Sequence, residues 1–206
     1  MRVLLALAAA LMLAACGADY SRAPDEEVAR ARYVHDGPPE IVLFTVINNR
    51  SEEGAHAALM VNGSERVIFD PAGTWYHPWA PIQLDVHYGI TPLIERRYVD
   101  YHTRITYRTV EQRIEVTPEV AEAALRTVKA YGAVPKALCG DAVSDVLRRT
   151  PGFETIPRTF FPRQIMRAFA KLPGVVTVTH TSGDPDDNKA KLQANEDEAA
   201  RRSARN

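Results

Sequence analysis

Three apolar, β-branched runs follow one another early in the chain and constrain its fold most strongly. "IVLFTVI" occupies 41–47, "AHAALMV" occupies 55–61 and "ERVIFD" occupies 65–70. Each run has the length and composition of a buried strand. Asn62-Gly63 lies between the second and third runs and is a strong hairpin signal. Strands joined by a tight turn pair antiparallel, so we expect an antiparallel sheet.

Helical patterns are interspersed with further strands. The expected helices cover about 92–102, 118–131, 139–150 and 162–171, and the expected strands cover 104–116 and 175–180. Thr91-Pro92 and Thr117-Pro118 each place a hydroxyl cap before a proline, and Gly132 ends the second helix. The 104–116 strand alternates at both ends and leaves room for a bulge midway. Hairpin strands with interspersed helices and no βαβ rhythm predict an α+β fold, an antiparallel sheet packed against helices.

Composition limits the number of domains and the class of partner. With 206 residues, of which 46% are hydrophobic, the chain can build one real core, and we place this domain at 40–180. A formal net charge of −1 without a basic patch argues against nucleic acid as a partner. Residues 181–206 hold one large apolar side chain, Leu192, among mixed charges, so we expect a disordered tail.

A short apolar segment near the N-terminus predicts export. Arg2 precedes an unbroken apolar run from Val3 to Leu13. This run is far shorter than the ~20 residues that span a bilayer, so it reads as the core of a signal peptide. It ends in Leu13-Ala14-Ala15-Cys16, which resembles the lipobox of bacterial lipoproteins.

The lipobox resemblance implies a location in the bacterial cell envelope. It implies removal of a signal peptide over 1–15 and acylation of Cys16, which would anchor a periplasm-facing protein to a membrane. Gly17 in the next position favours the outer membrane over the inner one. The polar stretch 16–39 ends in Gly37-Pro38-Pro39 and reads as a tether between the lipid and the domain.

Cys139 is the second of two cysteines and opens the predicted 139–150 helix. If Cys16 is acylated, Cys139 has no partner for a disulfide within the chain. The free N–H groups and positive dipole of a helix N-terminus lower the pKa of a thiol, and the thiolate is the nucleophilic form. The alternative is a buried cysteine that acts as a small hydrophobic residue.

His56 is the best candidate for a partner base. It lies in a strand of small and apolar residues, where an imidazole has no packing role. The alternative is a core histidine that bonds to the backbone. His77, His87 and His102 lie in loop and helix-end positions, so we expect them at the surface or in supporting positions.

Asp70 ends the third strand and could orient the imidazole or cap the turn that follows Pro71. The turn length separates these roles. A three-residue loop over 62–64 would place His56 directly opposite Asp70 on one face of the hairpin. A two-residue Asn62-Gly63 turn would place them on opposite faces, and we favour the first arrangement.

The three residues in this order resemble a known group of proteins. A histidine in "GAHAALMV", a polar residue in "VIFD" and a later cysteine opening the helix "LCGDAVSDVL" resemble the circularly permuted papain-like proteins of the NlpC superfamily, which include the YiiX-like and the lecithin:retinol acyltransferase-like branch. The resemblance covers about 40–170. Leu138 departs from the Asn or Asp that many members carry before the nucleophile, and Gly140 replaces a small hydroxyl residue.

The resemblance implies a thiol hydrolase or acyltransferase that acts on an amide or ester. Cys139 would be the nucleophile, His56 the general base and then acid, and Asp70 the residue that holds the imidazole tautomer. The N–H of Cys139 would contribute to binding the oxyanion. Peptidoglycan peptides and acylated envelope molecules are the expected substrates, and no cofactor or metal is implied.

Two features leave alternatives open. Trp75, Tyr76, His77 and Trp79 gather just beyond Asp70 and could line a substrate cleft, or they could pin their loop to the core. The departures at Leu138 and Gly140 also fit a catalytically silent binding or assembly lipoprotein. A metal site made of His77, Asp85 and His87 is disfavoured, because these residues form no tight ligand motif.

Overall fold

The computed structural model describes residues 18–204, so Cys16 and the expected signal peptide lie outside the described residues. Within that range the chain forms one seven-stranded antiparallel sheet with six helices, which confirms the α+β class. The strands are β1 (Glu40–Asn48), β2 (Gly54–Asn62), β3 (Arg66–Phe69), β4 (Ile82–Gln83), β5 (Val86–His87), β6 (Tyr107–Glu115) and β7 (Val176–His180). The helices are α2 (Asp25–Ala31), α3 (Pro92–His102), α4 (Pro118–Tyr131), α5 (Cys139–Arg148), α6 (Pro162–Phe169) and α7 (Lys189–Ser203).

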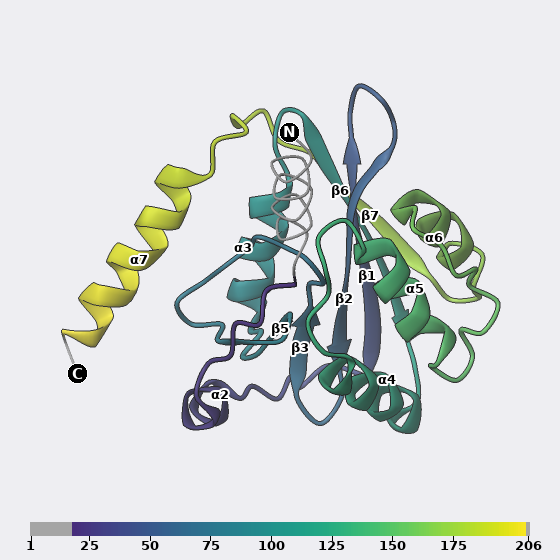
Figure 1. Cartoon of the computed structure of the whole chain (residues 1–206), viewed down its shortest axis with the longest axis horizontal. Helices are drawn as coiled ribbons and strands as arrows, with labels where there is room; N and C mark the ends of the chain where they lie inside the picture. Colours follow the sequence, from purple (N-terminus) through teal and green to yellow (C-terminus); the bar gives the residue numbers. More distant parts are fainter. Residues whose placement is uncertain (1–17, 205–206) are drawn as a thin grey trace, which may run out of the picture.

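The sheet carries helices on both of its faces (Figure 1). Successive side chains of β1 alternate between two hydrophobic clusters, because a strand directs its side chains to opposite faces. Ile41 and Leu43 face the cluster under α4, α5 and α6, whereas Val42 and Phe44 face the cluster under α3. Both faces are therefore buried, which explains why β1 reads as one continuous apolar run.

The strand order is β4-β5-β3-β2-β1-β6-β7. β1 and β6 pair over their whole lengths in a constant register. The bulge that the sequence allowed in the 104–116 strand is therefore absent from this pairing. The irregularity lies between β1 and β2 instead, where Ala55 is the extra residue. β3 pairs only with Leu59–Asn62, so the first half of β2 has no strand on that side among the described residues. This free stretch of edge contains His56 and Ala57.

The predicted helix caps are confirmed. The Thr91 hydroxyl accepts a hydrogen bond from the Ile94 N–H at 3.3 Å, and the proline that follows Thr91 opens α3. Thr117 caps α4 in the same way, and Gly132 ends that helix with a φ of 91°. These local signals fix where the helices start, and therefore which α3 side chains face the sheet.

The segment expected as a tether packs against the domain from residue 18, where the described residues begin. The Ala23 N–H donates to the Ile82 carbonyl at 2.8 Å, and the Leu84 N–H donates to the Ser21 carbonyl at 3.0 Å. Ala18 also forms an antiparallel bridge with Pro135. The sequence suggested a linker because the segment is polar, but its backbone groups pair with the β4 side of the sheet and with the α4–α5 loop.

The structure describes residues 181–204 of the segment for which the sequence suggested disorder. This segment continues from β7 and forms α7, which lies outside α3 (Figure 1). Its contacts are polar: Lys191 pairs with Asp100 at 2.8 Å, and Arg97 pairs with Glu198 at 2.6 Å. The mixed charges that suggested disorder find complementary charges on α3, which composition alone does not reveal.

Candidate active site

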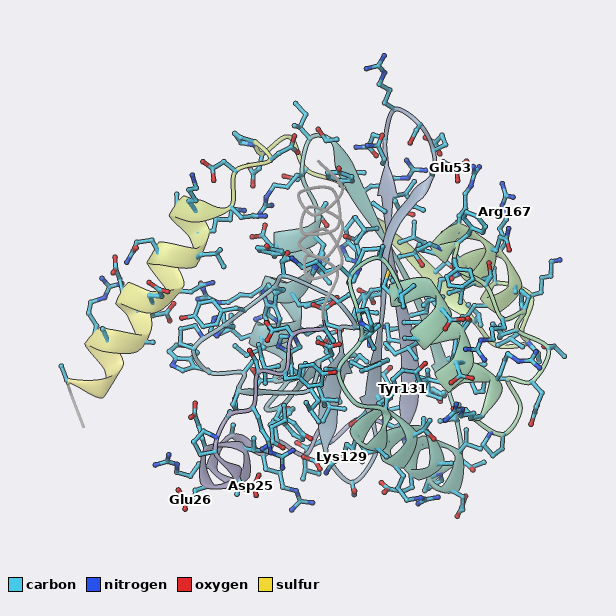
Figure 2. All side chains as sticks on the ribbon, in the orientation of Figure 1. Asp25, Glu26, Glu53, Lys129, Tyr131 and Arg167 are labelled. Atoms are coloured by element: carbon cyan, nitrogen blue, oxygen red, sulfur yellow. The ribbon has the colours of Figure 1, made fainter. Side chains whose placement is uncertain are left out.

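The β2–β3 turn is held by α4, and this contact sets the register of the hairpin. The Ser64 N–H donates to Glu122 Oε1 at 2.5 Å, and Lys129 Nζ lies 2.6 Å from Glu65 Oε1. Figure 2 labels Lys129 on α4. The turn therefore consists of Gly63, Ser64 and Glu65, and Asn62 belongs to β2.

This register corrects the expected position of His56. Leu59 pairs with Phe69, so the hairpin is shifted by two residues from the predicted pairing. Continuing this register places Asp70 opposite Ala58 and makes His56 its diagonal neighbour. A shift by two residues preserves the face, because side chains alternate with a period of two. His56 and Asp70 therefore still meet on the α3 side of the sheet.

Asp70 is the centre of the hydrogen-bonded site. Its Oδ1 accepts from His56 Nε2 at 2.7 Å and from the Tyr98 hydroxyl at 2.7 Å. The Asp70 side chain is 0% exposed, so these donors compensate the cost of burying a carboxylate. Because Nε2 of His56 is used in this way, Nδ1 is the nitrogen that remains for the thiol.

The other carboxylate oxygen of Asp70 has no hydrogen-bond partner among the described residues. It lies 3.8 Å from His87 Nε2, and a Cβ on Gly73 would stand only 1.8 Å from it. Only glycine at position 73 therefore lets the turn close around the carboxylate. The Gly73 N–H completes that turn by donating to the Asp70 carbonyl at 3.0 Å.

His102 supports the His56 ring from the end of α3. The two imidazoles are stacked, with centroids 5.6 Å apart and planes 9° apart. His102 Nδ1 lies 2.9 Å from the Tyr98 carbonyl oxygen, which requires that nitrogen to carry the proton. Burial lowers the pKa of His102 to about 4, so this ring is neutral at physiological pH. A neutral ring therefore packs flat against His56 and restricts its rotation.

Cys139 opens α5 beside the free edge of β2. The His56 ring and the N–H groups of Ala57 and Gly140 lie close enough to its thiol to lower the thiol pKa. The Ala57 N–H is available because β3 has already ended at this level of the sheet. Among the described residues no side chain caps α5, and Ala137 just before it has a φ of 68°, a strained value for alanine. The strained turn therefore places the sulfur of Cys139 at the uncapped N-terminus of α5.

Gly140 has a packing explanation. A Cβ at this position would lie 2.4 Å from the Phe160 carbonyl oxygen, which belongs to backbone and cannot easily move. The segment around Phe160 is fixed on α5 by Ser144, whose hydroxyl accepts from the Thr159 N–H at 3.1 Å. Glycine beside the thiol therefore follows from how closely this loop covers the start of α5.

The electrostatics of the trio favour a charged pair. Burial alone would lower the pKa of His56, but the charge and hydrogen bond of Asp70, with a smaller effect of Cys139, raise it to about 10. Burial alone would raise the pKa of Asp70, yet His56 holds it far below its usual range. Burial also opposes ionisation of Cys139, but His56 and the two N–H groups outweigh it and lower the thiol pKa. These shifts favour an imidazolium beside the Asp70 carboxylate, and they increase the fraction of Cys139 that is thiolate.

The same cluster could be considered as a metal site. His56, Asp70 and His102 each offer a ligand atom within 4.8 Å of the others. However, the two stacked rings direct their lone pairs in parallel planes, whereas a metal must lie in the plane of each bound imidazole. Nε2 of His56 is also occupied by Asp70. The arrangement therefore fits proton transfer better than metal binding.

The disfavoured metal trio of His77, Asp85 and His87 does not assemble in the described part of the chain. Asp85 Oδ2 accepts from the Val134 N–H at 2.8 Å and holds that loop in place. His77 Nδ1 accepts from the Trp79 N–H, while His87 Nε2 faces Asp70. His77 and His87 are each 2% exposed, so neither lies at the surface, and His87 takes a supporting position beside Asp70.

The aromatic loop beyond Asp70 packs into the core and does not line a cleft as a group. Trp75 meets the Tyr98 ring edge-on, with centroids 5.0 Å apart, and is buried in the cluster under α3. Trp79 packs against the same cluster. The Tyr76 hydroxyl donates to Glu196 of α7 at 3.1 Å. With His77 also buried, these residues fix the loop between the core and α7, which favours the alternative of a loop pinned to the core.

Sequence reasoning gave no role at the site to Tyr98, and for His102 it left a surface position and a supporting position open. Both contribute to the site, and one signal could have found them. They are four residues apart on one predicted helix, and residues at this spacing share a face. A phenol and an imidazole on one face of a helix next to a buried sheet indicate a polar site.

No protein-family model, curated protein or solved structure was found to match this chain. Over residues 18–204, no helix combines the length and the apolar composition that crossing a bilayer requires.

Proposed function

We propose that this chain is an envelope lipoprotein, anchored through Cys16, with a thiol hydrolase or acyltransferase site. Cys139 is the nucleophile, His56 the general base and acid, and Asp70 the residue that orients the imidazole. The observation that carries the proposal is the contact of His56 with both Asp70 and the Cys139 thiol. The substrate is an amide or ester, drawn from peptidoglycan peptides or acylated envelope molecules.

The order of the elements supports the circularly permuted papain-like arrangement of the NlpC superfamily. The histidine strand β2 comes first, the carboxylate follows β3, and the cysteine helix α5 packs against β2 later in the chain. This order is the one that the sequence resemblance implies. The fold assignment is part of the proposal.

The chemistry follows from the positions of the groups. The thiolate of Cys139 attacks the substrate carbonyl, and the uncapped N–H groups at the start of α5 are the available donors for the oxyanion. The His56 imidazolium donates its proton to the leaving amine or alcohol, which departs and leaves a thioester. His56 then takes a proton from water or an acceptor alcohol, whose oxygen attacks the thioester and releases Cys139.

Alkylation of the thiol tests the proposed ion pair directly. The full-length lipidated protein is treated with iodoacetamide across a range of pH, and mass spectrometry follows the peptide that contains Cys139. We expect an inflection below the ordinary thiol value of about 8.5. Replacing His56 with Asn should move the inflection back toward that value. An ordinary thiol profile in the unaltered protein would overturn the proposed site.

Turnover distinguishes the enzyme from a silent binding protein. The silent alternative is favoured by one observation, since Cys139 is only 8% exposed and a substrate must displace part of its cover. Muropeptides and acyl esters are incubated with the protein and with the Cys139→Ala variant. Turnover lost in the variant supports catalysis, whereas a reactive thiol without turnover of either substrate class supports the silent alternative.

A further inference from the structure

The N-terminal end of the described chain is joined to the loop that delivers the nucleophile. Ala18 pairs with Pro135 in an antiparallel bridge, and Cys139 follows Pro135 by four positions. The Leu138 N–H donates to the Pro135 carbonyl at 3.2 Å, so the intervening residues form a tight turn. The start of the domain and the start of α5 are therefore held side by side.

Chain length limits how far this point can be from the lipid. Cys16 precedes Ala18 by two positions, and two residues span at most about 7 Å. A lipid on Cys16 would therefore bring the membrane surface to the Ala18–Pro135 bridge, because no long linker separates them. The segment that the sequence suggested as a tether is used in packing.

The exposed side chains around the bridge have the chemistry of a membrane interface. We define the anchor face as Ala18, Tyr20, Pro135, Lys136 and Ala137. Tyr20 is 75% exposed, and the last three residues form an exposed turn. Tyrosine and lysine are favoured at the level of lipid headgroups.

The charges of this region also suit an anionic surface. Within the described residues Lys136 makes no ion pair or hydrogen bond through its ammonium, so its charge is available to lipid phosphates. The nearby Asp19 carboxylate keeps its negative charge and accepts from the Ser21 N–H and hydroxyl at 2.9 and 2.7 Å. Lys136 is the positive charge on the exposed turn itself.

We propose that the anchor face lies against the bilayer that holds the lipidated Cys16, with the start of α5 beside the membrane surface. This inference rests on the lipidation of Cys16 in the proposed function. The partner is the headgroup layer of an anionic membrane. The Cys139 site is thereby oriented toward substrates that are borne by the membrane.

Site-specific quenching by lipids tests the orientation. In the full-length lipidated protein with Cys139→Ser, a single cysteine is introduced by Lys136→Cys and labelled with a fluorophore. Lys171→Cys is the matched control, because Lys171 is also an exposed lysine and follows the C-terminal end of α6, the end opposite to Phe160, which contacts the start of α5 at Gly140. The proteins are placed in vesicles of phosphatidylethanolamine and phosphatidylglycerol that contain a headgroup nitroxide lipid.

We expect quenching at position 136 to exceed quenching at position 171 severalfold. A flexible glycine-serine insertion between Gly17 and Ala18 should reduce the difference by lengthening the link to the lipid. Equal quenching at the two positions overturns the orientation, and so does a Cys16 peptide without acyl mass. Alkylation of Cys139 is measured separately in the protein that retains it, so failure of the orientation is distinguished from failure of the thiol site.

Discussion

Asp70 holds together side chains from three separate parts of the chain. His56 comes from β2, Tyr98 from α3 and His87 from β5, and all three lie close to one carboxylate. A buried carboxylate is tolerated only when donors or positive charge compensate its lost hydration. The negative charge of Asp70 is therefore both a structural requirement of the site and the cause of the high His56 pKa.

Removing that charge while keeping the shape should separate these two effects. In the Asp70→Asn variant, the His56 pKa should fall because its main electrostatic partner is lost, and less Cys139 thiolate should form. We expect turnover to fall by about 10²–10⁴-fold. The alkylation profile of Cys139 should shift to higher pH. Asp25→Asn on the exposed surface of α2 is the control, and an unchanged profile in Asp70→Asn would show that Asp70 does not act through His56.

His102 is expected to hold His56 in position because its planar ring stacks on the His56 ring. Replacement by Phe keeps a planar partner for His56, whereas replacement by Ala removes it. We expect His102→Ala to lower turnover by about tenfold to a hundredfold, since His56 would no longer be held in position. His102→Phe should recover most of the loss. The alkylation rate of Cys139 against pH is the second measurement, because a general loss of stability would not change its midpoint.

Local signals define the helices at the level of single elements. Thr91-Pro92 and Thr117-Pro118 predict the starts of α3 and α4 because a hydroxyl cap and a proline satisfy backbone groups within a few residues. Cys139 is likewise placed at the start of α5 by the sequence pattern. Predictions of helix starts therefore need no knowledge of the remainder of the molecule.

The strand register depends on contacts that are distant in the sequence. The sequence predicts the shared face of His56 and Asp70 but places the turn one residue too early. Glu122 and Lys129 of α4 hold Ser64 and Glu65 in the turn, over more than fifty intervening positions. The Asn62-Gly63 signal predicts that a turn forms here, but it does not show that contacts with α4 decide which residues form it.

The close approach of Phe160 to α5 predicts a specific sensitivity. Gly140→Ala should destabilise the protein by about 1–3 kcal/mol, since the new methyl group meets backbone atoms. It should also disturb the helix start and slow alkylation of Cys139. Gly183→Ala is the matched control, because a Cβ there has no neighbour within 4 Å. Urea unfolding of both variants measures the difference, and equal stabilities would contradict the observed packing.

The polar segments at both ends of the described chain pack against the folded domain. Sequence composition suggests a tether and a disordered tail, because neither segment carries enough apolar surface to fold alone. In the structure the first is stabilised by backbone pairing with Ile82 and Leu84, and the second by ion pairs with α3. The apolar core was predictable from strand and helix patterns, whereas these polar contacts depend on surfaces that exist only after the core has folded.

The buried histidines give the whole molecule a defined response to acid. Burial lowers the pKa values of His77, His87 and His102 to about 4, so the folded protein binds fewer protons than the unfolded chain below about pH 6.5. Their contribution to stability is therefore present above that pH and is lost as the pH falls toward 4. His56 has the opposite sign: its contribution is complete below about pH 6.5 and is lost as the pH rises toward 10.

We expect the free energy of unfolding to fall by about 1–2 kcal/mol for each of the three histidines between about pH 7 and pH 5. Urea unfolding at both pH values measures this change. His87→Gln, which cannot be protonated in this range, should reduce the pH dependence by one such contribution. Stability that stays constant between the two pH values would show that the three rings are not held neutral by burial.

The three-residue turn after β2 has a consequence for how this sequence can vary. One added or deleted position between Asn62 and Arg66 would invert the facing of every side chain on β3, unless a bulge compensates for it. Asp70 would then move to the side of the sheet away from Tyr98. In related sequences that keep the site, the length of this turn should therefore change only by two residues at a time. The length of the turn then indicates whether a divergent sequence still places His56 and Asp70 on one face.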